Sequence, residues 1–436
     1  MTTLARKLRT IDYFTLAFGT MVGVGWLVVM DDWLGRGGPL GAMLGFAIGG
    51  AALLPVAYVY GRLVEVIPDA GSEIAYTDRA FGRQAGFAAG WMMILAYGIV
   101  CPWEAVAIGR IAAYLFPKLD SFEVYRVSGK PIYLPHLVLG LALVALVGIV
   151  NYRGIRSSAT VQNWATFALL ALFGVFAVCG VYRGSPTNLY PLFRGAALVS
   201  VLQTVQIVPY FLTGFESVPK CAEEAAPGLD PHQFMKPLFL ALAVGAAFYV
   251  SVIGVVAFVH PWRSLVQQDF ATAFAFEQAF RSRWIVNLIL AAALVSLLKV
   301  LNGNFVAASR LLFALGRRGL VAAHLGRVHP DNQTPSVAVI GIACASAGAL
   351  FLGSSILIPV TEVGSMASAA GWLASCAAYY RIETRARRQL IAALGGLVAT
   401  AMILMKVLPW LPGHFTRTEC GALIVWVVLG LVLRRA

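Results

Sequence analysis

The chain has 436 residues, of which 59% are hydrophobic and 12% are charged, and its mean hydropathy is +0.79. Soluble proteins carry roughly 25% charged residues, and a soluble chain of this length could not bury so much apolar surface, so the composition excludes a soluble protein. The net charge of +13 does not indicate nucleic-acid binding, because the Lys and Arg residues lie in short loops between apolar runs rather than in a basic stripe with aromatic residues.

Apolar runs long enough to cross a bilayer, about 20 residues each, recur along the chain. We predict an all-α, polytopic membrane protein with twelve transmembrane helices, near residues 13–34, 39–66, 84–115, 135–152, 160–183, 199–225, 234–259, 284–314, 336–352, 355–380, 388–408 and 418–434. Segment 1–12 lacks the short apolar core and cleavage site of a signal peptide and is expected to be a cytoplasmic tail.

Lys and Arg residues favour one set of alternate loops. The segments on the side of the N-terminus, in which we count Lys220 and Arg310, carry nearly twice as many as the segments on the other side. The positive-inside rule then places both termini in the cytoplasm and predicts a multi-pass protein of the cell membrane. The cysteines lack CxxC spacing and the histidines lack metal-ligand spacing, so we expect no metal and no cofactor.

Two predicted spans are interrupted. The first reads "FGTMVGVGWLVVMDDW" (18–33) and places Gly23 and Gly25 two residues apart, and the sixth is weakened at Pro209 and Gly214, directly before Glu216. Glycines also allow close helix packing, which is the alternative explanation for either helix alone. Interruptions at matching positions of two halves favour a transporter built on inverted repeats.

A break near Gly25 has a clear chemical use. The half-helix that begins there exposes backbone N–H groups that attract a carboxylate, and the carbonyls that end the preceding half can accept hydrogen bonds from an ammonium group. Glycine also lets a ligand touch the backbone, because no Cβ stands in the way.

Four stretches carry a resemblance to a known family. They are "GTMVGVGWL" (19–27), "PDAGSEIAYTDRAFG" (68–82), "YFLTGFESVPKCAEEA" (210–225) and "LNGNFVAASRLLFALGRRG" (301–319). In this order and on these spans, they resemble the amino acid–polyamine–organocation (APC) superfamily of secondary transporters, whose members share the LeuT-type five-plus-five inverted repeat.

The resemblance implies one repeat over 13–183, an inverted repeat over 195–380, and two further helices over 385–436. It also implies a substrate site between helices one, three, six, eight and ten, in which an aromatic residue near the helix-six break closes the outer side. The site residues carried over are Met21, Val22, Gly23, Val24, Gly25, Trp26, Phe211, Gly214, Phe215 and Glu216.

Two positions depart from the family pattern. Val24 stands where the family has a small hydroxyl residue, so one hydrogen-bond donor for a substrate carboxylate is missing. Sodium-independent relatives often carry a lysine on helix five, and stretch 161–174 has none.

Ionisable residues inside predicted spans are functional candidates, because each costs a few kcal/mol unless it has a partner. We expect Lys299 of the eighth span to supply the positive charge that relatives take from sodium or from the helix-five lysine, as a counter-ion or a proton carrier; the alternative is a lysine that reaches an interface. Asn302 joins it in the predicted coupling set. Asp31 and Asp32 are expected to be solvated acids of the outer vestibule; the alternative is a functional role in raising the local concentration of cationic substrates.

Three acids have open alternatives. Glu104 receives a substrate amino group or joins a proton path, or else forms a structural pair with Arg110. Glu362 pairs with Lys299 or gates the pathway, or else lies near the membrane surface. Glu216 is a gate or substrate contact, or else a first-turn acid of the second half-helix.

These features predict a secondary transporter that moves an amino acid or related amine by alternating access, coupled to protons. An exchanger and a non-transporting nutrient sensor on the same fold remain alternatives. An enzyme is not expected, since the chain has no HExxH, GxSxG or P-loop motif, and no filter-like repeat suggests a channel. The surplus of acids and the valine at position 24 favour a cationic or neutral substrate over an acidic one, and a substrate with an amine and no carboxylate remains an alternative. Nothing in the sequence requires a dimer.

Overall fold

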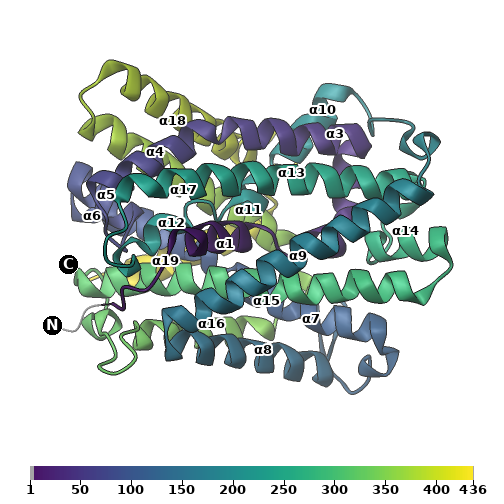
Figure 1. The fold of residues 1–436 in the computed structure, drawn as a ribbon, viewed down its shortest axis with the longest axis horizontal. Coiled ribbons are helices and arrows are strands. Elements are labelled where there is room, and N and C mark those ends of the chain that lie inside the picture. The colour runs from purple at the N-terminus through teal and green to yellow at the C-terminus, as the bar shows by residue number, and fades with distance from the viewer. Residues whose placement is uncertain (1–3, 436) are drawn as a thin grey trace.

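The computed structural model describes residues 4–435. Most helices run side by side along one axis (Figure 1). The backbone N–H of Ala5 bonds to the carbonyl of Gln333 and that of Arg435 bonds to the carbonyl of Leu320, so both ends of the described chain meet the connection between two late helices. We call this end of the bundle the terminal face.

The N-terminal part of the bundle is interrupted after α1 and kinked within α3. Helix α1 (Thr10–Met21) is followed by the short α2 (Gly25–Val28), then by α3 (Met30–Ala52) and α4 (Leu54–Val66). Helix α3 is kinked at Gly38, where φ is +64° and a Cβ would lie 2.7 Å from the backbone N of Arg194. Only glycine fits there, and this kink separates the first predicted span from the second.

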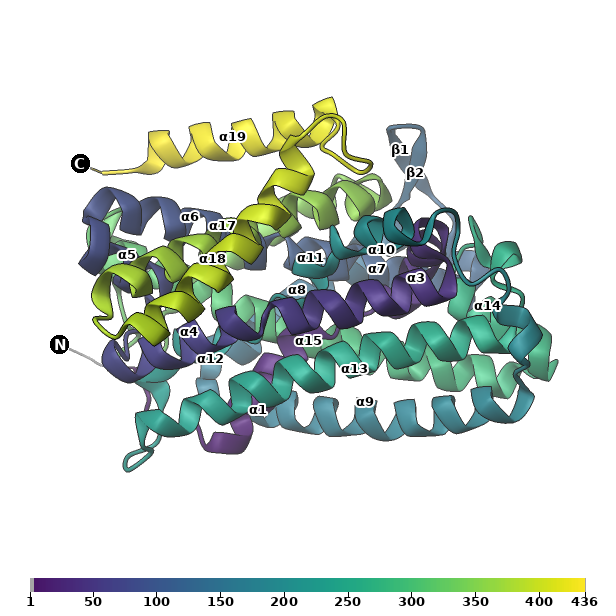
Figure 2. The ribbon, with the colours of Figure 1, turned by 90° about the horizontal axis from the view of Figure 1, so that it is seen from above.

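The remaining elements follow in chain order. The helices are α5 (Glu73–Phe81), α6 (Arg83–Gly98), α7 (Val100–Leu115), α8 (Leu134–Arg153), α9 (Ile155–Arg183), α10 (Ala197–Val205), α11 (Val208–Leu212), α12 (Ser217–Lys220), α13 (Met235–Val259), α14 (Ala271–Phe280), α15 (Arg283–Arg317), α16 (Ser336–Leu350), α17 (Leu357–Ile382), α18 (Ala386–Val407) and α19 (Arg417–Leu433). Strands β1 (Glu123–Val127) and β2 (Lys130–Tyr133) form an antiparallel hairpin that projects from the bundle (Figure 2). We call the end with this hairpin and α14 the hairpin face.

Within residues 4–435, eight helical stretches are long and apolar enough to cross a membrane. They are Thr10–Val28, Met30–Val66, Arg83–Leu115, Leu134–Arg153, Ile155–Arg183, His232–Val259, Arg283–Arg317 and Ala386–Val407. The chain is therefore mostly helical, as predicted, and its apolar helices are consistent with a polytopic membrane protein. The number of twelve spans stays a prediction, because α16 is short and the sixth predicted span is divided among α10, α11 and α12. The inverted repeat and the domain limits stay predictions as well.

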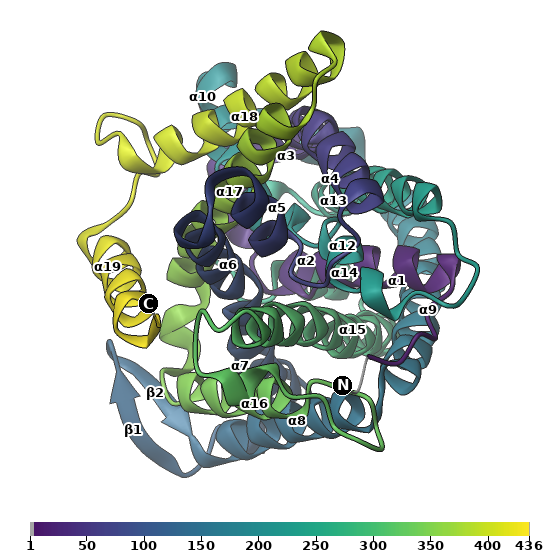
Figure 3. The same cartoon turned by 90° about the vertical axis from the view of Figure 1, so that its left-hand side faces the viewer.

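The first helix lies in the interior of the bundle. Seen from the terminal face, α1 packs among α9, α13 and α15, while α18 and α19 lie at the periphery (Figure 3). Apolar side chains of α19 such as Ile424, Val425 and Val432 are exposed, as expected of a surface that faces lipid. The interruption after α1 is therefore surrounded by protein, which is the setting in which irregular backbone is tolerated at membrane depth.

Candidate functional site

The two interrupted helices meet at their breaks. Helix α1 ends at Met21 and α2 begins at Gly25, while α11 and α12 are separated by Thr213 to Glu216. Gly214 has φ +136°, and a Cβ on it would lie 2.7 Å from the backbone N of Met21. The two weak points that the sequence shows far apart therefore form one irregular region.

Lys299 occupies the carbonyl end of α1. Its Nζ donates hydrogen bonds to the carbonyl oxygens of Val22 (2.5 Å) and Gly19 (3.2 Å), and it lies 5.1 Å from the centre of the Phe18 ring. Ser296, one turn earlier on α15, donates to the carbonyls of Val22 (3.1 Å) and Gly23 (2.9 Å). Lys299 is fully buried, so the alternative in which it reaches an interface is wrong.

Glu104 of α7 lies against the same break. Its side chain is 3% exposed, and a Cβ on Gly23 would lie 2.4 Å from its Oε1. Its Oε2 has no hydrogen-bond partner among the described residues. The proposed pair with Arg110 is wrong, since Arg110 donates to Asp269 (2.5 Å) and faces the Phe270 ring (5.2 Å). Six residues of helix turn the two side chains to different faces.

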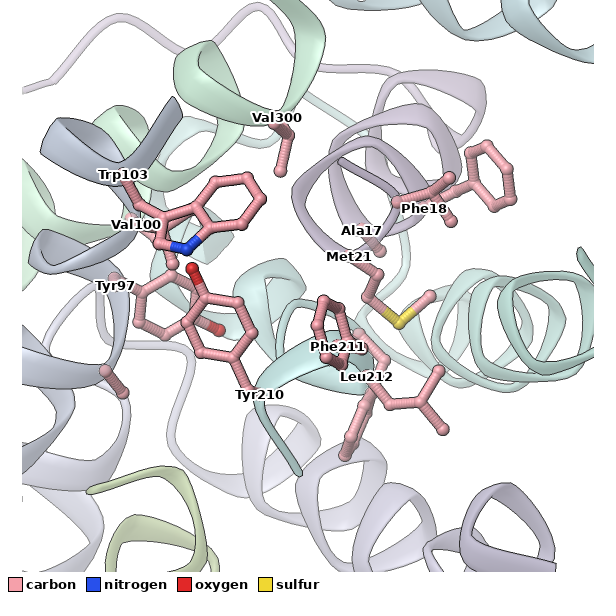
Figure 4. Packing of buried hydrophobic residues seen from close by; sticks show 14 of the residues in the cluster. Ala17, Phe18, Met21, Tyr97, Val100, Trp103, Tyr210, Phe211, Leu212 and Val300 are labelled. Carbon is pink, nitrogen blue, oxygen red and sulfur yellow. The ribbon is translucent and has the colours of Figure 1, made fainter. Parts of the chain in front are cut away.

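A small enclosed cavity adjoins this carboxylate. Its volume is about 10 Å³, room for roughly one water molecule. Figure 4 shows Trp103, Tyr210, Phe211, Met21 and Val300 arranged around it. Of the predicted site residues, those that line the cavity are Met21, Gly23, Gly25, Glu104 and Phe211.

Sequence reasoning missed the aromatic lining. Trp103, Tyr210 and Tyr249 line the cavity, and the Tyr249 hydroxyl donates to the carbonyl of Met21 (2.8 Å). Trp103 and Tyr210 directly precede the predicted residues Glu104 and Phe211 in the sequence, and this position could have identified them as site candidates. Tyr249 is a polar aromatic residue within a long, mainly apolar stretch of α13.

Two predicted aromatic contacts point away from the cavity. Trp26 packs against Phe176 (centroids 5.8 Å apart) and Phe248 (6.5 Å), between α9 and α13, so its indole does not enter the site. Phe215 packs against Tyr60 (6.2 Å) and Trp372 (5.8 Å), so of the two aromatic residues considered for closing the site, Phe211 is the one at the cavity.

Asn302 connects helices. It accepts hydrogen bonds from Asn151 (3.0 Å) and Ser158 (3.0 Å), and it donates to Gln162 (2.9 Å). These bonds join α15 to α8 and α9, and Asn302 does not contact the cavity.

Glu362 does not pair with Lys299. It accepts hydrogen bonds from Arg36 (2.8 Å) and from Lys406, which is buried on α18. Arg36 also bonds Asp32 at 2.7 Å, so this acid is ion-paired and half-buried rather than freely solvated. Asp31 beside it is half-buried as well. The network ties α3, α17 and α18 together toward the hairpin face.

A second buried ion pair lies toward the terminal face. Lys220 Nζ bonds Glu73 Oε1 at 2.6 Å, both side chains are fully buried, and Tyr60 donates to the same oxygen (2.8 Å). The Lys220 Nζ also donates to the carbonyl of Glu216 (3.0 Å), whose own carboxylate accepts from the N–H of Gly214 (3.1 Å). The prediction that Lys220 is a loop charge is therefore wrong, and Glu73 was missed.

Arg310 is also inside the protein. It makes a two-point contact with Glu224 (2.8 and 3.1 Å), and neither side chain is exposed. Counting Arg310 among loop charges was wrong, because paired cations can lie inside a bundle.

Comparison with known proteins gives the family. A family model described as "Amino acid permease" matches residues 8–433. Similar proteins from Bacillus subtilis are the methylthioribose transporter (27% identical, covering 84% of this chain and 79% of its own length) and the branched-chain amino acid permease BcaP (27%, 83% and 77%). Amino-acid permease RocE of the same species is 23% identical and covers 85% and 79%. The chain therefore belongs to the amino acid permease family of the APC superfamily, and it is a transporter rather than an enzyme.

Proposed function

We propose that this permease moves an amino acid or a related amine across the cell membrane by alternating access, and that protons drive the transport through Lys299. The observation that carries the proposal is the hydrogen bonding of Lys299 Nζ to the carbonyls of Gly19 and Val22, at the break of α1.

The position of Lys299 supports a role in coupling. Carbonyls at the C-terminal end of a half-helix attract cations, and a lysine fixed there supplies a positive charge without a bound metal ion. If the ammonium group loses its proton, its bonds to α1 weaken and the half-helix can move. Glu104, which packs on Gly23, is the only acid among the described residues that line the cavity, and it is the second candidate carrier.

The closed cavity supports alternating access. A volume of about 10 Å³ does not hold an amino acid, so a ligand can enter only if the surrounding helices separate. The pairs Glu73–Lys220 and Glu224–Arg310 lie toward the terminal face, and Glu362–Lys406 lies toward the hairpin face. We infer that these ion pairs open in turn as gates.

The relatives support a broad substrate class. Their names include a branched-chain amino acid permease, cationic amino acid transporters and a methylthioribose transporter. The acid and the aromatic rings at the cavity of this chain favour a substrate with an amino group over an acidic one.

Uptake into proteoliposomes tests the proposal. A labelled panel of amino acids and amines is offered with an inward proton gradient, with a sodium gradient, and with neither, to the wild type, Lys299→Ala and the control Lys236→Ala, which changes an exposed lysine of α13. We expect proton-driven uptake by the wild type and the control, and loss of the proton dependence in Lys299→Ala.

Other outcomes separate the alternatives. Proton-driven uptake that survives in Lys299→Ala would remove Lys299 from coupling but leave transport intact. Uptake only into vesicles preloaded with substrate would indicate an exchanger. Binding of a panel member without uptake or exchange would indicate a sensor.

A further inference from the structure

The carboxylate of Glu104 packs on the backbone of the helix break. In an amino-acid site at a helix break, the carboxylate is drawn to the backbone N–H groups after the break. Here Oε1 of Glu104 packs on Gly23 so closely that a Cβ there would lie 2.4 Å away. We propose that Glu104 stands in for the substrate carboxylate, so that the ligand is a cationic amine without an α-carboxylate. This rests on the proposed function and names its substrate class.

A second carboxylate would be repelled. Glu104 is 3% exposed, and two like charges a few ångströms apart repel strongly where water is excluded. Among the described residues that contact this break, Lys299 is the only cation, and its Nζ already donates to two carbonyls. No Lys, Arg or His lines the described part of the cavity.

Among the described residues, three of the four hydroxyls that line the cavity already donate to carbonyls, and only that of Tyr210 is free. The hydroxyls of Thr20, Thr213 and Tyr249 donate to the carbonyls of Leu16 (2.5 Å), Pro209 (2.6 Å) and Met21 (2.8 Å) respectively. Each hydroxyl has one proton, so these three are committed.

Acceptors, by contrast, are available. Oε2 of Glu104 and the hydroxyl oxygen of Tyr210 are buried and have no partner among the described residues. Both can accept a hydrogen bond from an ammonium group, which carries only donors; the Tyr210 hydroxyl can also donate, whereas the ionised Glu104 carboxylate can only accept. An unpartnered buried carboxylate oxygen is costly, and an ammonium ligand relieves that cost.

The aromatic rings complete a site for a cation. Trp103, Tyr210, Phe211 and Tyr249 line the cavity, and the face of an aromatic ring attracts an organic cation at close range. The same rings pack against the apolar part of the ligand. Carboxylate, phenol and rings together match an organic ammonium ion.

Matched pairs of ligands test the inference by binding. Purified protein in detergent is titrated calorimetrically with agmatine and arginine, cadaverine and lysine, isobutylamine and valine, and phenethylamine and phenylalanine. We expect the amine of at least one pair to bind about tenfold or more tightly than its parent amino acid, because the parent adds a carboxylate beside Glu104.

Two variants of Glu104 sharpen the test. Glu104→Gln keeps the shape and removes the charge, and it should weaken amine binding by about tenfold or more. Glu104→Ala frees the space at Gly23 and should shift the preference toward the parent amino acid. Glu123→Gln, an exposed acid of the hairpin, is the control and should leave binding unchanged. Melting curves confirm that each variant is folded.

The results separate this inference from the proposed function. Tighter binding of the amino acid in every pair, no binding by any amine, or unchanged amine binding by Glu104→Gln would each overturn the inference. Uptake of amino acids in the same preparation would leave the transport proposal standing. Amine-selective binding without uptake or exchange would overturn transport and support the inference.

Discussion

Gly214 and Met21 join the two helix breaks of this permease, since a Cβ on Gly214 would lie 2.7 Å from the backbone N of Met21. The contact places a turn of the sixth predicted span directly on the end of α1. Movement of one break is therefore transmitted to the other through backbone, without an intervening side chain.

Replacement of Gly214 should uncouple this contact. In Gly214→Ala the new methyl group meets the Met21 backbone, and the φ of +136° is unfavourable for alanine, so we expect a loss of about 1–3 kcal/mol in unfolding free energy together with loss of uptake. Gly174→Ala is the control, because a Cβ there meets nothing within 4 Å. Unfolding in mixed micelles and proteoliposome uptake measure the two effects; equal behaviour of the two variants would contradict the prediction.

Phe211 and Phe215 provide a matched pair that tests the location of the site. Phe211 lines the cavity, whereas Phe215 packs on Tyr60 and Trp372. We expect Phe211→Leu to weaken ligand affinity by roughly three- to tenfold, as loss of an aromatic contact does, and Phe215→Leu to lower the melting temperature with little change in affinity. The reverse pattern in calorimetric titrations would move the site to the side of Phe215.

The sequence indicated where the backbone would be irregular but not where side chains would point. Glycines at 23, 25 and 214 mark the two breaks, because helix propensity is a local property. Across a break the regular rotation of 100° per residue is lost. Trp26 is one residue beyond Gly25 and yet faces α9 and α13 instead of the cavity.

For charged residues, the sequence likewise predicts the position but not the partner. The depth of a charge along a helix can be counted, so Lys299 is recognisable as a residue far from both ends of α15. The partner of a charge depends on how the helices rotate and pack against one another, which the sequence of a single helix does not determine. Glu362 therefore bonds Lys406 and Arg36 rather than Lys299, and Lys220, which ends the short α12, is enclosed by α5 and its neighbours.

Breaking the Glu73–Lys220 pair should cost more than removing it. Both side chains are fully buried, so Glu73→Gln leaves an uncompensated ammonium group inside the bundle, with an expected loss of about 3 kcal/mol or more in unfolding free energy. The double variant Glu73→Gln with Lys220→Met should recover much of that loss while remaining defective in transport, if the pair is a gate. Full transport by the stable double variant would show that the pair is structural.

The Glu362–Lys406 pair makes the corresponding test toward the hairpin face. Lys406 and Glu362 are buried, and Arg36 is a third member of the network. Lys406→Met leaves Glu362 paired with Arg36, so we expect only a small fall in the melting temperature, whereas Glu362→Gln leaves two cations close together and should destabilise the protein by about 3 kcal/mol. Melting curves in detergent compare the two variants. A larger effect of Lys406→Met than of Glu362→Gln would mean that Arg36 does not hold Glu362 in the membrane-embedded protein. Adding Lys406→Met to Glu362→Gln should restore much of the stability, because it removes the buried ammonium group that the single substitution leaves without a counter-charge, while Arg36 keeps Asp32 as its partner.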